Sequence, residues 1–210
     1  MIISNCLANQ RQGICETMFE ELLKSFITLF IIIDPFMSAV YFISMSKNMS
    51  IKESNEAIWT AIGVAAALLF IFLFSGLYLL NILGISFNGF MIAGGIILLI
   101  MGVTTVLAID YSTKAEQTKS AAILIGTPLL SGPGALTTII ILSKSYGYII
   151  PGLAALAVLI VSFCILKFAH HFQRWLGTEI IEILSKVLGL LLAALAVDFI
   201  QKGIMGFVGG

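Results

Sequence analysis

The sequence has few charged side chains. Only 10% of its 210 residues are Asp, Glu, Lys or Arg, against about 25% in a soluble domain. Eleven Lys and Arg balance eleven Asp and Glu, so no net positive charge is available to bind nucleic acid. Hydrophobic residues make up 60% of the chain, and the mean hydropathy is +1.10. A soluble enzyme, a nucleic-acid-binding protein and a disordered chain are therefore excluded, which leaves a polytopic membrane protein.

Metal-binding and catalytic patterns are also missing. Cys6, Cys15 and Cys164 are spaced too irregularly for a CxxC site or a disulfide framework. Cys6 and Cys15 can pair only if their segment faces an oxidising space. The adjacent His170 and His171 are expected at the membrane interface rather than on a metal. No P-loop, nucleophile elbow or zinc spacing occurs, so the sequence predicts neither ATP-driven transport nor a cofactor. A membrane enzyme is the alternative, but it would need more buried acid–base groups than Asp34 and the distant Asp198 supply, so we predict that the chain is not an enzyme.

Long apolar segments dominate what is present. A membrane helix needs about 20 mostly apolar residues. Six segments meet this length: residues 22–46, 57–80, 87–109, 121–143, 149–168 and 183–208. The fourth is interrupted by Pro128, Gly132, Pro133 and Gly134, so a count of five holds if that segment does not cross. We predict six spans.

The polar stretches divide the chain. Residues 1–21 form a polar arm without the long apolar run and cleavage site of a signal peptide, and Met18 offers an alternative start. Residues 22–109 then contain three spans. A polar linker, residues 110–120, separates them from the remaining three spans in residues 121–208.

The Lys and Arg residues predict an orientation. With six spans, one side of the membrane carries Arg11, Lys24, Lys144 and Lys202. The other side carries Lys47, Lys52, Lys114, Lys119, Lys167 and Arg174. Cytoplasmic loops are enriched in Lys and Arg. The second side is therefore predicted to face the cytoplasm, with both termini outside the cytoplasmic membrane.

An internal repeat is the most informative feature. Asp34-Pro35 lies at the centre of the first span, and Gly132-Pro133 lies at the centre of the fourth. Each half holds an odd number of spans, so the second half is predicted to be inserted upside down. Inverted repeats with matched Gly/Pro interruptions indicate a secondary transporter with a site near the bilayer midplane. The sequence thus predicts an all-α polytopic membrane protein with six transmembrane helices in two inverted three-helix repeats; the alternative is chance likeness between leucine-rich segments.

The two interruptions have a specific chemistry. Proline breaks a helix from within but is favoured as its first residue. Asp34 can therefore cap a helix that begins at Pro35, and Gly132 is a weaker cap for one that begins at Pro133. Lipid cannot satisfy the free N–H groups of such helix starts, which favour negative charge. Both starts are candidate binding points inside the membrane.

A zwitterion fits between these two starts. Its carboxylate would lie on the N–H groups near Gly134 and Ala135, and its ammonium would pair with Asp34 or with unpaired backbone carbonyls. An intramembrane Asp costs at least about 2.5 kcal/mol on insertion scales and usually marks a transport site. The alternative is that Asp34 only caps its helix. Asp198, near the outer end of the last span, is a weaker candidate.

Hydroxyl side chains complete the predicted site. Ser and Thr in membrane helices more often bond backbone carbonyls than ligands, yet several flank the two interruptions. The predicted substrate-binding residues are Asp34, Pro35, Ser38, Ser131, Gly132, Pro133, Gly134, Ala135 and Thr137. Gly94 and Gly95, by contrast, are expected to allow close helix packing.

Four stretches resemble the MarC family, described as six-span neutral amino acid transporters. They are Ile-Asp-Pro-Phe from Ile33, Ile-Ala-Gly-Gly-Ile from Ile92, Pro-Leu-Leu-Ser-Gly-Pro-Gly-Ala from Pro128, and Gly-Leu-Leu-Leu-Ala-Ala-Leu-Ala from Gly189. The resemblance covers residues 18–206 and implies transport of small neutral amino acids such as glycine or alanine. Where the family usually has Asp-Pro-Phe-Gly-Asn, this chain has Met37 and Ser38 in the last two positions. The bulky Met would narrow the pocket, and Ser offers fewer hydrogen bonds than Asn.

Three functions are weighed on these grounds. A secondary transporter of small neutral amino acids explains Asp34 and both interruptions. A channel, or an exporter of drugs or metabolites, would not need Asp34, and a structural or signalling membrane protein would tolerate loss of both interruptions. The expected partners are the amino acid and the lipid bilayer. The coupling ion (proton or sodium) and a homo-oligomeric state are left open.

Overall fold

The structure is a computed structural model that describes residues 2–46, 49–107 and 132–208. Within those residues it is entirely helical, without β-strands. The helices are α1 (Ile2–Ile33), α2 (Pro35–Ser46), α3 (Ile51–Ile82), α4 (Phe87–Val106), α6 (Pro133–Tyr146), α7 (Ile149–Lys167) and α8 (Ala169–Val208).

Five stretches of these helices are long and apolar enough to cross a membrane. They are Thr17–Val40, Ile51–Ile82, Phe87–Val106, Ile149–Lys167 and Ile180–Val208. They correspond to five of the six predicted spans. Of the sixth, predicted at residues 121–143, the structure describes only α6, which has 14 residues. Residues 121–131, with Thr127, Pro128 and Ser131, lie outside the described residues.

Side chains cap the starts of α3 and α4. Before α3, the Ser50 hydroxyl accepts a hydrogen bond from the Glu53 N–H at 3.3 Å, and the Glu53 carboxylate accepts one from the Ser50 N–H at 2.9 Å. Before α4, the Ser86 hydroxyl accepts from the Gly89 N–H at 3.2 Å. These bonds satisfy N–H groups that a helix start leaves free. Gly84, at φ +66°, supplies the left-handed backbone of the tight turn between α3 and α4.

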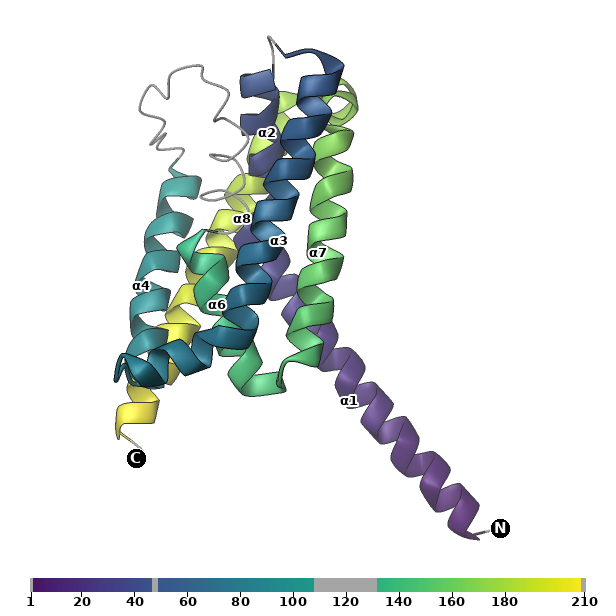
Figure 1. Cartoon of the computed structure of the whole chain (residues 1–210), viewed down its shortest axis with the longest axis vertical. Helices are drawn as coiled ribbons and strands as arrows, with labels where there is room; N and C mark the ends of the chain where they lie inside the picture. Colours follow the sequence, from purple (N-terminus) through teal and green to yellow (C-terminus); the bar gives the residue numbers. More distant parts are fainter. Residues whose placement is uncertain (1, 47–48, 108–131, 209–210) are drawn as a thin grey trace.

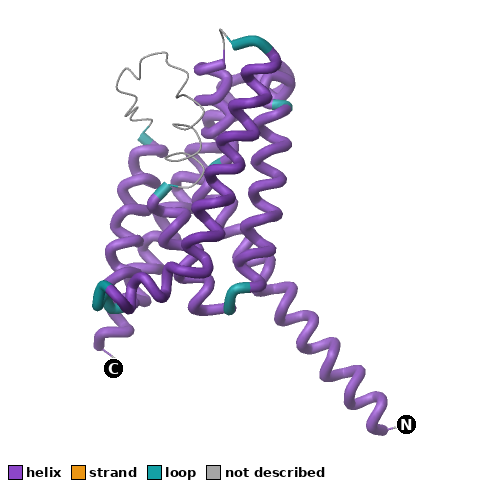
Figure 2. Tube along the Cα trace, in the orientation of Figure 1, coloured by secondary structure: helices purple, strands orange, loops and turns teal. Residues whose placement is uncertain are grey.

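The helices form one elongated bundle, with the N-terminal part of α1 projecting beyond it (Figure 1). The α3–α4 turn, the α6–α7 turn and the C-terminus lie at one end of the bundle. The junctions α2–α3 and α7–α8 lie at the opposite end, and the described loops, drawn in teal, are short (Figure 2). The described loops therefore lie at the two ends of the bundle as the six-span prediction assigned them to the two sides of the membrane. The loop at residues 110–119 lies outside the described residues.

Two helices extend beyond the apolar segments of the sequence. Helix α1 continues from Ile2 to Ile33 and passes position 21, the predicted end of the polar arm, without a break. Helix α8 begins at Ala169 and contains a sharp bend at Gly177, whose φ is +77°. The side chains of Cys6, Cys15, His170 and His171 lie outside the described part of the chain.

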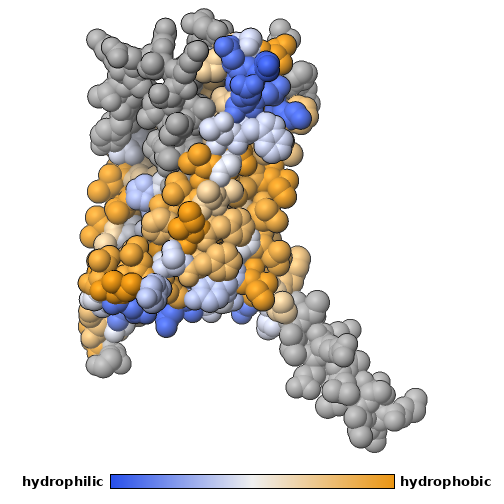
Figure 3. Space-filling view, in the orientation of Figure 1, coloured by the Kyte–Doolittle hydropathy of each residue, from blue (hydrophilic) through white to orange (hydrophobic). Residues whose placement is uncertain are grey.

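The surface is apolar around the middle of the bundle. Figure 3 shows hydrophobic residues gathered across this face, with hydrophilic residues toward both ends. Large apolar side chains such as Phe74, Leu153 and Ile160 are more than half exposed. A water-soluble protein rarely exposes so much contiguous apolar surface. The apolar surface around the middle of the bundle therefore faces lipid.

Helices α4 and α8 pack with their backbones in contact. A Cβ atom added to Gly102 would lie 2.8 Å from the Ala193 nitrogen and 2.8 Å from the Gly189 oxygen. One added to Gly95 would lie 2.8 Å from the Ala196 oxygen. Small residues that permit such approach are a common basis of helix association in membranes. The prediction that Gly95 serves close helix packing is confirmed.

Candidate functional site

The regular helical backbone is interrupted at Asp34. This residue separates α1 from α2 and has φ +40°, the only positive φ outside glycine among the described residues. Helical hydrogen bonding continues on both sides, because the Asp34 N–H donates to the Phe30 oxygen and the Ser38 N–H donates to the Asp34 oxygen, both at 3.1 Å. A non-glycine residue rarely adopts this backbone conformation, which is sterically unfavourable.

The Asp34 side chain explains how this backbone is held. Its Oδ1 accepts a hydrogen bond from the Met37 N–H at 3.1 Å, and the Phe36 N–H also donates to the carboxylate. Pro35, the first residue of α2, has no N–H to satisfy. The Asp34 carboxylate thus accepts hydrogen bonds from the free N–H groups at the start of α2. Asp34 acts as a cap, and its predicted role as the partner of a ligand ammonium stays a prediction.

The start of α6 is built differently. Gly132 precedes the helix, Pro133 is its first residue, and no side chain caps it among the described residues. The first hydrogen bond of the helix runs from the Leu136 N–H to the Gly132 oxygen at 3.1 Å. No described side chain caps the N–H groups of Gly134 and Ala135. Gly132, Gly134 and Ala135 are all buried. A buried helix start without a cap favours an anion or another acceptor.

The two helix starts lie close together. A Cβ atom added to Gly134 would lie 3.5 Å from Cγ2 of Ile32, two residues before Asp34. From this level α2 and α6 run toward opposite ends of the bundle (Figure 1). Gly134 at the start of α6 is therefore close to the end of α1, although almost half of the chain separates the two positions in sequence.

The surroundings of Gly134 differ from the expectation. A ligand carboxylate on the N–H groups near Gly134 would need open space beside this glycine. In the structure its Cβ position lies 2.5 Å from Cδ2 of Leu98 and 3.4 Å from Sδ of Met101, both on α4. This side of Gly134 is filled by helix packing, so any approach to its N–H must come from another direction.

The predicted hydroxyl residues bond to their own helices. The Ser38 hydroxyl donates to the Asp34 oxygen at 3.1 Å, and the Thr137 hydroxyl donates to the Pro133 oxygen at 2.7 Å. Both bonds reach back one turn to a carbonyl at the start of the helix, and both side chains are buried. The Thr137 side chain also packs against Gly94 of α4, which confirms the prediction of close packing at Gly94. Ser131 lies outside the described residues.

Thr138 is a site candidate that the sequence reasoning did not select. It is completely buried, and its hydroxyl has no hydrogen-bond partner among the described residues. Residues four apart lie on one face of a helix, so Thr138 shares the face of Gly134, which contacts α1 and α4. The four-residue spacing between Gly134 and Thr138 is the feature of the sequence that could have identified Thr138 as a site candidate. A buried hydroxyl without a partner costs about 1–3 kcal/mol, which calls for a compensating role.

The other acidic candidate lies on the surface of α8. The Asp198 carboxylate pairs with the Lys202 amine at 2.7 Å, and both side chains are substantially exposed. Lys186 pairs with Glu182 at 2.9 Å on the same helix. Exposed pairs of this kind, one helical turn apart, contribute little to stability. The ion pair gives Asp198 a local function that is separate from the two helix starts.

Comparison with known proteins agrees with this architecture. Residues 19–208 match the MarC family of integral membrane proteins. The chain belongs to the MarC family. Relatives include an Archaeoglobus fulgidus UPF0056 membrane protein, 31% identical over 86% of this chain and 90% of the relative. The Escherichia coli UPF0056 membrane protein YhcE is 30% identical over 89% of this chain and 93% of its own length. No solved structure matches the chain.

Proposed function

We propose that this MarC-family protein is a secondary transporter of small neutral amino acids such as glycine or alanine. The substrate would bind between the starts of α2 and α6 and cross the cytoplasmic membrane by alternating access. One observation carries the proposal. The start of α6 packs against the last turn of α1 inside an apolar bundle, where the Asp34 carboxylate caps α2 and no described side chain caps α6.

The two starts offer complementary charges to a zwitterion. The N–H groups of Gly134 and Ala135 attract the carboxylate, because a helix start carries a partial positive charge. The Asp34 carboxylate attracts the ammonium group while its Oδ1 keeps the cap on α2. Both charges of the substrate are then paired within an apolar interior, where an unpaired charge is costly.

The chain organisation supports alternating access. Helices α2 and α6 run in opposite directions from the level of the two starts (Figure 1), as an inverted repeat requires. In transporters built from such repeats, one half rocks against the other around a central site. We place the loops at residues 47–56, 110–119 and 170–179 on the cytoplasmic side. Proton or sodium coupling is the variable that transport assays must identify.

Uptake of labelled glycine into proteoliposomes tests the proposal. Uptake should be saturable, should compete with unlabelled alanine, and should respond to an imposed proton or sodium gradient. Empty liposomes measure leakage, and Asp198→Asn protein provides a control in which an exposed carboxylate on α8 is neutralised. Flux no greater than in empty liposomes would reject the proposal. Non-saturable flux, or flux of drugs without amino acids, would favour the channel or exporter instead.

A further inference from the structure

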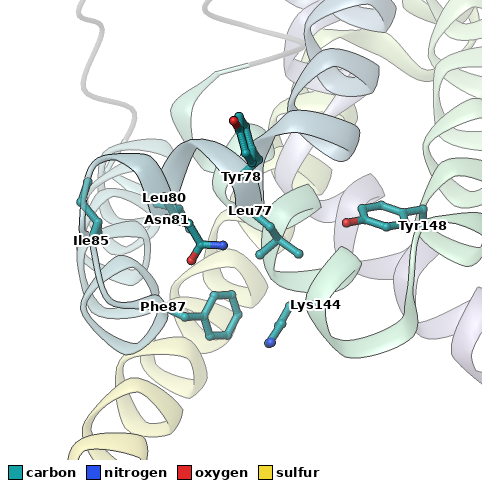
Figure 4. A pocket seen from close by; sticks show the side chains of 8 residues that line it. All are labelled: Leu77, Tyr78, Leu80, Asn81, Ile85, Phe87, Lys144 and Tyr148. Carbon is teal, nitrogen blue, oxygen red and sulfur yellow. The ribbon is translucent and has the colours of Figure 1, made fainter.

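A cavity of about 390 Å³ opens at the end of the bundle that carries the α3–α4 and α6–α7 turns. Asn81 near the end of α3, Phe87 at the start of α4, Lys144 near the end of α6 and Tyr148 before α7 line it. In Figure 4, Asn81 and Phe87 lie on one side of Lys144 and Tyr148 lies on the other, with the Tyr148 hydroxyl directed toward the other three residues and the Lys144 amine toward the bottom of the view. The cavity is separate from the two helix starts described above and is partly open to the surface.

The cavity lies at the level of the membrane surface. The membrane-spanning stretch of α3 ends at Ile82, that of α4 begins at Phe87, and that of α7 begins at Ile149. The lining residues therefore lie where apolar helices meet water, at the depth of lipid headgroups. Tyr148 suits this depth, since tyrosine is enriched at membrane interfaces.

The lining selects for an anion with an apolar part. Lys144 supplies one positive charge, and no carboxylate lines the cavity. The ion pairs among the described residues do not include the Lys144 amine. The Asn81 amide and the Tyr148 hydroxyl add hydrogen-bond donors, and Leu77, Ile85 and Phe87 supply apolar walls.

We propose that this cavity binds the phosphate headgroup of an anionic phospholipid. Lys144 pairs with the phosphate, Asn81 and Tyr148 donate hydrogen bonds to its oxygens, and the apolar walls contact the glycerol and the first acyl carbons. A bound headgroup would link the α3–α4 turn of the first half of the chain to the α6–α7 turn of the second half.

Native mass spectrometry of the full chain in detergent tests this assignment. The wild-type protein is titrated with phosphatidylglycerol and, in parallel, with phosphatidylcholine. Phosphatidylglycerol should bind more tightly, and Lys144→Gln should weaken its binding about fivefold, as expected for one cation near anionic lipid. Lys144→Arg should retain binding. Lys202→Gln is the matched control, since it removes one positive charge at the same end of the bundle but outside the cavity.

Three results would overturn the proposal. Equal weakening by Lys144→Gln and Lys202→Gln would show a general effect of charge. Unchanged binding in Lys144→Gln would show that lysine serves only the C-terminal end of α6. Displacement of the lipid by glycerol phosphate at equal concentration would assign the site to a soluble phosphate ester. If Lys144→Gln does not fold, Asn81→Asp provides an independent variant, because its new carboxylate should repel the phosphate and reduce phosphatidylglycerol binding.

Discussion

Gly134, the second residue of α6, lies against Ile32, in the last turn of α1 before Asp34. A Cβ atom at Gly134 would be 3.5 Å from Cγ2 of Ile32 and 2.5 Å from Cδ2 of Leu98. Ile32 and Leu98 are almost completely buried. The two chain interruptions are thus held together by direct packing, and a side chain at position 134 would separate them.

Gly134→Leu should therefore destabilise the bundle. Overpacking of a filled interior costs about 1–3 kcal/mol, and sometimes more. The expected result is a lower thermal unfolding temperature in detergent, accompanied by loss of transport. Gly63→Leu on α3 is the control, because no atom lies within 4 Å of its Cβ position. Equal unfolding temperatures for the Gly134→Leu and wild-type proteins would contradict the tight packing of α6 against α1.

Asp34→Asn should separate the charge of Asp34 from its capping role. Asn caps a helix about as well as Asp, and its side-chain oxygen can still accept the hydrogen bond from the Met37 N–H. The protein should keep its unfolding temperature and lose most glycine uptake in proteoliposomes. Asp34→Ala should lose uptake and should also lower the unfolding temperature, because loss of the cap costs about 0.5–2 kcal/mol of stability. Uptake by Asp34→Asn at the wild-type rate would show that the carboxylate is a structural cap only.

Thr137 and Thr138 form a matched pair of adjacent hydroxyls. Thr137→Val removes a bond to the Pro133 oxygen and should lower the stability by about 0.5–1.5 kcal/mol. Thr138→Val removes a hydroxyl without a partner, so it should raise the unfolding temperature. If the Thr138 hydroxyl contacts the substrate, the same variant should transport glycine more slowly. A lower unfolding temperature for Thr138→Val would show that this hydroxyl has a stabilising partner.

Cysteine labelling in intact cells tests the orientation. In a protein without Cys6, Cys15 and Cys164, a cysteine introduced at Lys52 should resist a membrane-impermeant reagent, because that loop is predicted to face the cytoplasm. A cysteine introduced at Ser86, at the other end of the bundle, should react. Labelling at position 52 with protection at position 86 would reverse the predicted orientation.

The sequence by itself determined the class of the protein and most of its helices. Apolar runs of membrane-spanning length are local features, so five of the six predicted spans correspond to membrane-length stretches in the structure. The helix starts at Pro35 and Pro133 were also predictable, because proline and its preceding cap act within a few residues. The predicted organisation as inverted repeats depends on more than these local rules and stays a prediction.

Only the tertiary structure decided which side chains meet. The contact of Gly134 with Ile32 and Leu98 and the cavity shared by Asn81 and Lys144 join residues from different helices. The burial of the Thr138 hydroxyl likewise depends on how α6 packs against its neighbours. These contacts depend on how each helix is rotated and how the helices cross. Hydropathy carries little of that information in a membrane, because an apolar face is stable against lipid as well as against another helix.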